Sequence, residues 1–443
     1  MFDPAAEAMD EDERARLQEH RLRSLIDRLL EAGGVQAGRL LAAGVTAGAE
    51  VSLADLPKLP VTRKHDLWDH YPFGMLAVPL DDVVAVHGSS GTGGRPTLVG
   101  YTRGDIALWS QMCARALAAA GADTTSLVHN AYGYGLFTGG IGIHQGAVTL
   151  GATVIPVSGG MTERQLTLLA DLRPDILACT PSHAVRLGEA LAASGRSPAD
   201  LGLRAGLFGA EPWSEPMRAR IEELLGLRAL DIYGLSEIIG PGVAAECAEV
   251  ADGLHVNEDH FIVEVIDPVT GDPLADGQAG ELVFSTPTRE ALPLLRYRTG
   301  DVAALRRDRC PCGRTLVTMT KVAGRTDDMI VIRGVNVYPA EVEQVVLADT
   351  RLAPHYLLVV DARSPVKELI VAVECITAGT QPSSEPPDIP ALTGALAGAL
   401  RDRLGVRAQV RMLPAGTVPR PEAGKAVRVV TWADGEPPVP GLS

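Results

Sequence analysis

This sequence has few aromatic residues, a deficit of basic residues and few cysteines. Aromatic residues make up 4% of the 443 positions, and 40 lysines and arginines face 55 aspartates and glutamates. The resulting formal charge of −15 argues against a nucleic-acid partner, because nucleic-acid-binding proteins need a basic surface to neutralise phosphates. No apolar run approaches the roughly 18 residues that cross a bilayer, so we expect no membrane partner.

Six cysteines in a chain of this length are too few for a disulfide scaffold. The N-terminal stretch MFDPAAEAMDEDE is acidic and lacks the basic region that opens a secretory signal. These two features predict a protein of the reducing cytoplasm. Hydrophobic residues nevertheless make up 46% of the chain, which is enough for a large buried core divided among two or more domains.

Alternating apolar runs and helical patterns between about 83 and 240 predict parallel βαβ units. The expected strands are Val83–Val86, Ser126–His129, Thr153–Val157, Asp175–Cys179, Arg204–Phe208 and Ala229–Tyr233, and the expected helices lie near 10–32, 105–119, 140–150, 162–172, 183–193 and 214–225. Short strands joined by turns over 260–305 predict a small β-rich subdomain. A mixed pattern after about 327 predicts an α+β unit. We therefore expect an α/β fold with domains at 1–326 and 327–443.

A glycine-rich loop follows the first expected strand. The segment HGSSGTGGRPT, from His87 to Thr97, combines four glycines with Ser89, Ser90 and Thr92. Glycines let backbone N–H groups approach an anion, and hydroxyl groups add further donors. The loop differs from the Walker A motif, which requires Gly-Lys-Ser/Thr at the start of a helix. The alternative is a flexible surface loop.

Two further segments carry nucleotide-binding chemistry. In DIYGLSEIIGP the ring of Tyr233 can stack on a flat base, and the carboxylate of Glu237 can hold Mg²⁺. In YRTGDVA, Asp301 follows a tight glycine turn and can accept hydrogen bonds from ribose hydroxyls. Each segment alone also fits an ordinary strand and turn.

A potential metal site combines residues from two parts of the chain. Cys310 and Cys312 form a Cys-x-Cys pair, and Cys247 and His255 precede it. Together they have the Cys₃His composition of a closed, structural zinc site. Four unligated side chains remain the alternative, since free cysteines are often simply buried.

Four segments together match one family in order and spacing. They are AYGYGLFTGG (131–140), GAEPWSEPMR (209–218), YGLSEIIGPGVAAEC (233–247) and GRTDDMIVIRGVNVYPAEVE (324–343). Over nearly its whole length the chain resembles the phenylacetate–CoA ligase branch of the adenylate-forming superfamily. The resemblance implies that the small C-terminal domain rotates on a hinge at Asp327 between two half-reactions.

The resemblance also implies roles for individual residues. The phosphate loop would comprise Ser89, Ser90, Gly91, Thr92 and Gly94. Here Gly93 stands where the family usually has threonine, and Arg95 where it usually has lysine. The remaining nucleotide contacts would come from Gly209, Ala210, Glu211, Asp231, Tyr233, Ser236, Asp301 and Arg325. Glu237 would hold Mg²⁺, and Lys425 would reach the substrate carboxylate and the α-phosphate.

The acid substrate is expected near residues 131–140. Three aromatic side chains crowd this stretch of an otherwise aromatic-poor chain, which suits a flat apolar ring. The substrate-binding residues implied are Tyr132, Tyr134, Gly135, Phe137, Gly140 and Ile238. Ordinary core packing is the alternative for these aromatic residues.

These observations predict an ATP-dependent aromatic-acid–CoA ligase that forms an acyl-adenylate and then transfers the acyl group to coenzyme A. The expected cofactors are ATP, Mg²⁺ and coenzyme A, with Zn²⁺ as a structural ion, and a homodimer is left open. One alternative is an adenylating enzyme that loads an aryl acid onto a carrier-protein thiol. A second is a nucleotide-binding regulatory protein without catalysis, although both Lys425 and Glu237 are present. A zinc hydrolase is disfavoured, because the cysteine set has the composition of a closed site.

Overall fold

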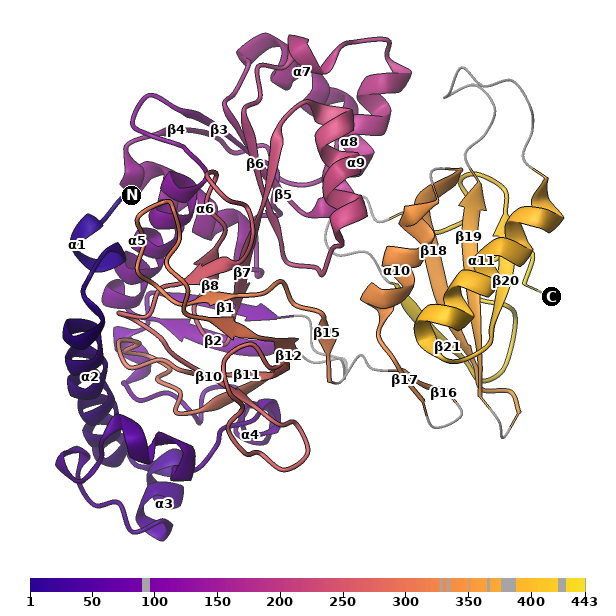
Figure 1. Ribbon diagram of the computed structural model, residues 1–443. Helices are drawn as coiled ribbons and strands as arrows, with labels where there is room; N and C mark the ends of the chain where they lie inside the picture. The colour runs from indigo at the N-terminus through magenta and orange to yellow at the C-terminus, as the bar shows by residue number, and fades with distance from the viewer. Residues whose placement is uncertain are drawn as a thin grey trace. The chain divides into compact units, whose positions relative to one another are not determined.

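The computed structural model describes residues 1–89, 96–326, 330–332, 335–349, 351–364, 367–375, 388–420 and 428–442. The chain forms two compact units, each described separately below (Figure 1). The first comprises Met1–Ala210 and Leu224–Val322, and the second comprises Glu211–Glu223 and Ala323–Ser443. The predicted boundary between residues 326 and 327 stays a prediction.

A nine-stranded sheet forms the centre of the first unit, in the order β13-β14-β9-β8-β7-β6-β5-β3-β4. Five strands pair in parallel: β3 (Leu127–Asn130), β4 (Thr153–Ile155), β5 (Ile176–Cys179), β6 (Ala205–Gly209) and β7 (Arg228–Leu235). These are the strands expected from the βαβ pattern. The antiparallel strands β8 (Gly240–Ala245), β9 (Leu254–Val256), β13 (Leu305–Arg306) and β14 (Thr318–Met319) extend the sheet.

Helices connect the parallel strands as the sequence pattern predicts. They are α5 (Arg103–Ala119), α6 (Gly139–Leu150), α7 (Thr162–Leu172) and α8 (Pro181–Ala193), and α9 (Glu215–Leu225) lies between β6 and β7 in the chain. The side chain of Thr102 accepts a hydrogen bond from the backbone of Asp105 and so caps α5. Thr180 caps α8 in the same way. The N-terminus of each helix is thereby fixed next to the end of a strand.

The first expected strand behaves differently from the others. β1 (Ala85–Ser89) lies outside the nine-stranded sheet and pairs antiparallel with β2 (Thr97–Tyr101). The prediction that Val83–Val86 belongs to the parallel pattern was therefore wrong. The connection between β1 and β2 is too short for the crossover that parallel pairing requires, so the chain turns back on itself. Both ends of the glycine-rich loop are consequently held by one ladder.

The β-rich region and the N-terminal segment complete the first unit. Strands β10 (Ile262–Ile266), β11 (Gly280–Ser285) and β12 (Tyr297–Ala303) pair antiparallel, in agreement with the predicted subdomain. The N-terminal helices are α1 (Pro4–Glu7), α2 (Glu11–Ala32), α3 (Gly34–Ala42) and α4 (Lys64–Asp69). α2 covers the predicted range 10–32 and buries Leu22, Leu25, Ile26 and Leu29 along one face. α4 lies outside the ranges in which the sequence predicted helices.

The second unit contains the sheet β20-β19-β18-β21. Its strands are β18 (Leu352–Asp361), β19 (Glu368–Cys375), β20 (Ala408–Leu413) and β21 (Val429–Trp432), accompanied by α10 (Pro339–Ala348), α11 (Ile389–Leu404) and the hairpin β16 (Ile330–Ile332) with β17 (Val335–Val337). This is the predicted α+β unit. The sequence pattern missed β21, which pairs in parallel with β18.

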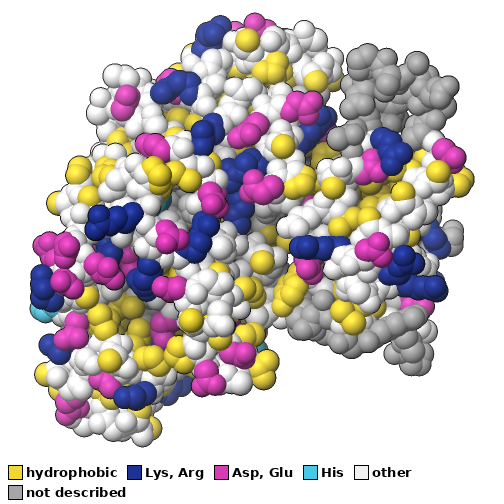
Figure 2. Space-filling model, in the orientation of Figure 1, with side chains coloured by type: hydrophobic (Ala, Val, Ile, Leu, Met, Phe, Trp, Pro, Cys, Tyr) yellow, Lys and Arg dark blue, Asp and Glu magenta, His cyan; other side chains and the backbone are white. Residues whose placement is uncertain are grey.

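On the face shown in Figure 2, Lys and Arg side chains are interspersed with Asp and Glu. Among the residues described, none of the helices is both long enough and apolar enough to cross a bilayer.

Candidate active site

Three polar side chains meet beside the glycine-rich loop. Ser89 ends β1, and its hydroxyl donates a hydrogen bond to Oε1 of Glu237 at 2.9 Å. The Nζ of Lys64 lies 3.6 Å from the same oxygen. Glu237 follows β7, and its side chain is 3% exposed. Serine and glutamate, predicted from separate motifs, are therefore neighbours, while Ser90, Gly91, Thr92 and Gly94 lie outside the described residues.

Lys64 is a site residue that sequence reasoning missed. It opens α4, whose position is fixed by the pairing of Asp66 with Arg39 at 2.5 Å and 2.7 Å. The indole Nε1 of Trp68, also in α4, donates to Oγ1 of Thr97 at 2.9 Å. α4 is thus tied to the strand that leaves the glycine-rich loop. In the sequence, Lys64 is one lysine in a charged segment, and such lysines are common on exposed helices. Nothing local therefore marked it as a site residue.

Tyr233 and Asp301 form a second buried pair. The hydroxyl of Tyr233 in β7 donates to Oδ2 of Asp301 in β12 at 2.7 Å. One face of the tyrosine ring is stacked on Phe284, with centroids 6.0 Å apart and planes inclined by 26°. The backbone N–H of Asp301 donates to Oγ1 of Thr299 at 3.0 Å. The structure brings together the residue expected at the adenine and the residue expected at the ribose.

The residues after β7 form a turn that is bonded to other elements of the first unit. The hydroxyls of Ser236 and Thr138 lie 3.3 Å apart, and Ile238 is fully buried. The hydroxyl of Tyr101 donates to the backbone carbonyl of Ile239 at 3.0 Å. Burial raises the pKa of Tyr101 well above its usual value, so this hydroxyl stays protonated as a donor. The turn that carries Ser236 and Glu237 is therefore anchored to β2.

The end of β6 carries backbone strain. Gly209 is buried at the end of the strand, and Ala210 adopts a φ of 72°, which is uncommon for residues other than glycine. Such outliers concentrate at functional sites. Asp231 is buried within β7, and its backbone N–H donates to Glu246 at 2.7 Å. Glu211 and Arg325 belong to the second unit.

The aromatic segment after β3 is organised by a residue that was not predicted. The Nδ2 of Asn130 donates to the hydroxyl of Tyr134 and to the carbonyl of Gly140, each at 2.8 Å. The Tyr134 hydroxyl lies 3.1 Å from Nδ1 of His144 in α6. Burial raises the pKa of Tyr134, although the hydrogen bond from Asn130 opposes the shift. A polar residue ending a buried strand was the only available signal for Asn130.

The other residues of this segment occupy different environments. Tyr132 is 5% exposed, and its hydroxyl lies 3.4 Å from the carbonyl of Leu207 in the core. Phe137 is 56% exposed. Gly135 has a φ of 139°, and a Cβ at Gly140 would lie 2.6 Å from the carbonyl of Gly133. Both glycines are therefore required by the backbone itself.

The cysteine and histidine set forms one cluster. The ligand atoms of Cys247, His255, Cys310 and Cys312 all lie within 4.8 Å of one another. The Sγ atoms of Cys247 and Cys310 are 3.7 Å apart, and Sγ of Cys312 is 3.5 Å from Nε2 of His255. A tetrahedral zinc with bonds of about 2.3 Å to sulfur and about 2.0 Å to nitrogen has edges of about 3.8 Å and 3.5 Å. These two separations thus match the edges of a tetrahedral zinc site.

The electrostatics of the cluster differ from thiol to thiol. Burial raises the pKa of Cys247 to about 12. Burial also acts on Cys312, but hydrogen bonds from Arg314 outweigh it and lower the pKa of that thiol. Arg314 in turn pairs with Glu7 at 2.7 Å. The N-terminal segment is therefore bonded directly to the loop that carries two of the cysteines.

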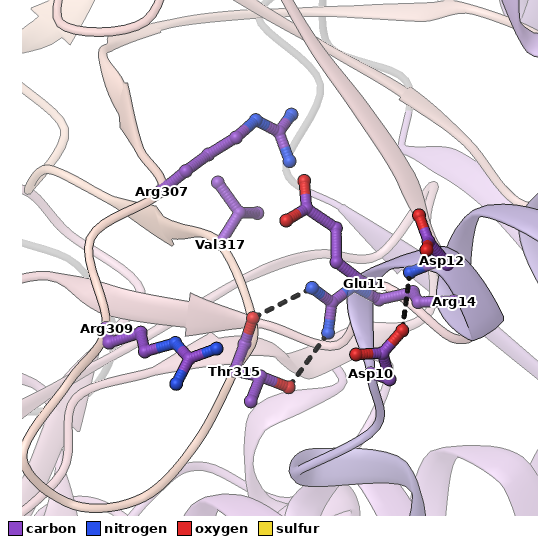
Figure 3. A pocket seen from close by; sticks show the side chains of 8 residues that line it. All are labelled: Asp10, Glu11, Asp12, Arg14, Arg307, Arg309, Thr315 and Val317. Carbon is purple, nitrogen blue, oxygen red and sulfur yellow. Dashed lines mark hydrogen bonds between the residues drawn. The ribbon is translucent and has the colours of Figure 1, made fainter.

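A polar pocket of about 250 Å³ lies beside this loop (Figure 3). It is lined by Asp10, Glu11, Asp12, Arg14, Arg307, Arg309, Thr315 and Val317. Arg14 bridges its two sides, because its guanidinium donates to the side chain and the carbonyl of Thr315 at 3.0 Å and 2.8 Å. The pocket thus lies between the start of α2 and the loop that carries Cys310 and Cys312, and both acidic and basic side chains line it.

Comparison with known proteins identifies the family. The AMP-binding enzyme family matches residues 27–289, and the AMP-binding enzyme C-terminal domain matches residues 334–431. A phenylacetate-coenzyme A ligase of Thermus thermophilus is 48% identical over 440 residues, covering 97% of this chain and 99% of the relative. This chain belongs to the phenylacetate–CoA ligase family. Membership makes it an ATP-dependent, AMP-forming acid–CoA ligase that works through an adenylate.

Two further comparisons agree with this assignment. A phenylacetate-coenzyme A ligase of Escherichia coli is 46% identical over 419 residues, which cover 94% of each chain. The crystal structure of a 2-hydroxyisobutyryl-CoA ligase in a postadenylation state superposes with a TM-score of 0.88 at 28% identity. That superposition covers 97% of this chain and 91% of the ligase. The mixed α/β architecture with its C-terminal unit is therefore confirmed, whereas Asp327 and Lys425 lie outside the described residues.

Proposed function

We propose that this ligase activates phenylacetate or a closely related aryl carboxylate and transfers the acyl group to coenzyme A. The observation that carries the proposal is the 48% identity with a phenylacetate-coenzyme A ligase along 97% of the chain. The aromatic segment supports an aryl substrate, because Tyr134 beside His144 and the exposed Phe137 offer aromatic surface next to a few polar groups.

The first half-reaction joins two anions. A carboxylate oxygen of the acid attacks the α-phosphorus of ATP, the bond to the β-phosphate oxygen breaks, and pyrophosphate leaves. No general base is required, since a carboxylate is already nucleophilic at neutral pH. Lys425 would neutralise charge that develops on the phosphate oxygens, which is the largest contribution expected from the protein. Tyr233 and Asp301 would orient the nucleoside.

Glu237 is the residue suited to hold Mg²⁺. Its carboxylate is a hard oxygen ligand, and a hydroxyl group lies beside it at 2.9 Å. A bound magnesium ion would supply positive charge at the phosphates. Ser89 would fix the orientation of the carboxylate toward that ion.

The second half-reaction is a thiolysis. The thiolate of coenzyme A attacks the carbonyl carbon of the adenylate, a thioester forms, and AMP leaves. Adenylation and thiolysis need different surroundings, and the predicted hinge at Asp327 would exchange them. The C-terminal domain family matched at residues 334–431 supports such a division of labour.

The cysteine and histidine cluster would hold a structural zinc ion. All four positions are filled by side chains, which leaves no open coordination site for catalysis. Its role would be to fasten the 310–312 loop to the end of the nine-stranded sheet.

The decisive experiment is a panel of acids assayed with two acceptors. Thioester formation is measured with phenylacetate, benzoate, aminobenzoate and an aliphatic acid of similar size, with either coenzyme A or a phosphopantetheinyl carrier protein. The proposal predicts the highest kcat/KM for an aryl acid with coenzyme A. A preference for the aliphatic acid would refute the aryl assignment, and loading of the carrier protein alone would favour the other acceptor.

A further inference from the structure

The contact between Lys64 and Glu237 has no role in the chemistry described so far. Nζ of Lys64 lies 3.6 Å from Oε1 of Glu237, and the two side chains are 23% and 3% exposed. Burying a carboxylate without a partner is unfavourable, so a nearby cation stabilises its charged form. Within the described part of the chain, Lys64 is the cation that lies within 4.0 Å of this carboxylate.

The position of Lys64 is set by its helix. α4 is held on one side by the Arg39–Asp66 pair and on the other by the hydrogen bond from Trp68 to Thr97. The ammonium group lies 5.8 Å from the centroid of the Trp68 ring, a distance at which cation and ring attract each other. The lysine is thus held beside Glu237 by three independent contacts of one short segment.

We propose that Lys64 is a positioning residue that takes the place of Mg²⁺ at Glu237 while the enzyme is free of nucleotide. It neutralises the carboxylate and keeps Oε1 in place, and it yields the carboxylate when the metal arrives with ATP. This inference rests on the proposed function, which assigns Glu237 to Mg²⁺. A purely structural alternative is that the pair only ties α4 to the sheet.

The net charge of the site distinguishes replacement of Mg²⁺ from a purely structural tie. With Lys64 and Glu237 both present, the pair has no net charge, whereas removal of the lysine leaves one negative charge facing a polyanionic nucleotide. ATP without metal should then bind more weakly. Neutralising Glu237 in the same protein should restore binding, because the site again has no net charge.

The test measures ATP binding by calorimetry, first with a chelator present and then with saturating Mg²⁺. The substitution Lys64→Met keeps the apolar stem of the side chain and removes its charge. We expect the Kd for metal-free ATP to rise about tenfold in Lys64→Met, because an unscreened like charge near the phosphates is unfavourable. With saturating Mg²⁺ the difference should shrink to about twofold, since the metal then satisfies Glu237.

The double variant Lys64→Met/Glu237→Gln provides the second arm. Its Kd for metal-free ATP should return to within about twofold of the wild-type value, as expected for two residues that act through each other. The matched control is Lys58→Ala, since this exposed lysine pairs with Asp55 and should change nothing. The melting temperature of each variant verifies that it is folded.

Each result has one interpretation. A loss of affinity that is the same with and without Mg²⁺, or that the second substitution does not restore, would overturn the proposal in favour of a structural tie. Absence of ATP binding and of pyrophosphate exchange in the wild-type protein would instead count against the proposed function itself.

Discussion

The hydroxyl of Tyr233 donates to the carboxylate of Asp301 at 2.7 Å, across two different sheets of the same unit. Tyr233 lies in the nine-stranded sheet and Asp301 in the antiparallel β-rich region. The tyrosine therefore has two kinds of contact, since one face of its ring is stacked on Phe284 and its hydroxyl orients the carboxylate of Asp301. Both residues are buried, so neither depends on solvent for its position.

Substitution of Tyr233 by phenylalanine should separate these two contacts. The ring remains, but Asp301 loses one hydrogen-bond donor, a change of about 1 kcal/mol. We expect the KM for ATP in pyrophosphate exchange to rise about fivefold, with kcat within about twofold of wild type. Tyr233→Ala should be considerably worse, because the stacking surface is lost as well. A collapse of kcat at unchanged KM would contradict this division.

Removal of metal should destabilise the protein without direct effects on chemistry. The purified chain is expected to carry about one zinc per molecule, bound by the four residues of the cluster. Dialysis against a strong chelator should lower the melting temperature by about 5 °C or more, because the metal contributes to folding free energy. Zinc is measured by atomic emission and unfolding by calorimetry.

The matched variants are Cys312→Ser, within the cluster, and Cys375→Ser, outside it in the second unit. The first should lose most of the zinc, and the second should retain it. Equal zinc content in the two variants would show that the cluster is not the metal site.

A network of three buried polar side chains, His129, Gln165 and His183, should make the free energy of unfolding depend on pH. Nε2 of His129 lies 3.1 Å from Oε1 of Gln165, and Nε2 of Gln165 lies 3.2 Å from Nε2 of His183. Nδ1 of His129 is buried without a hydrogen-bond partner, so a second proton there would be unsatisfied. Burial lowers the pKa of both histidines to about 4.

The folded protein therefore binds fewer protons than the unfolded chain between pH 6.5 and 4. The contribution of these two histidines to the free energy of unfolding is fully present above pH 6.5 and is lost as the pH falls toward 4. From pH 6.5 to 5, each histidine should account for about 1.5 kcal/mol of lost stability. Urea unfolding at several pH values measures this slope. His129→Gln/His183→Gln should reduce this slope but not remove it, because burial also lowers the pKa of His255 and His260 to about 4. His20→Gln, at an exposed position, should leave the slope unchanged.

The sequence predicted the elements of the fold well where patterns are local. Strands β3 to β7 and helices α5 to α8 were expected close to their observed bounds, because each has its own local apolar pattern. β21 was missed, since it has only four residues and is defined by its pairing with β18, which the sequence does not show. β1 was assigned to the wrong pattern, because strand propensity does not specify the partner strand.

In the candidate site, too, the sequence predicted single residues but not the contacts between them. Glu237 and Ser89 were each predicted from their own motifs, yet nothing in either motif shows that they are hydrogen-bonded. Lys64 and Asn130 were missed because their importance arises from contacts made in the folded chain. The four metal-site candidates were predicted from residue type and the Cys-x-Cys spacing, and the fold brings them together.

Lys425→Ala should block the first half-reaction selectively. The resemblance assigns this lysine to the charge that develops on the α-phosphate, and losing one such contact costs several kcal/mol in the transition state, roughly 100-fold or more in rate. Thiolysis of a supplied acyl-adenylate by coenzyme A should proceed within a few-fold of wild type. Near-normal pyrophosphate exchange in the variant would disprove the assignment, and Lys367→Ala serves as the control.

The most direct test of the account is phenylacetate-dependent exchange of labelled pyrophosphate into ATP in the absence of coenzyme A. Exchange requires reversible formation of the acyl-adenylate and nothing that follows it. The account predicts exchange that depends on both phenylacetate and Mg²⁺ and that is abolished by Glu237→Gln. Acyl-CoA formation from phenylacetate with no exchange under any condition would contradict a mechanism through an acyl-adenylate.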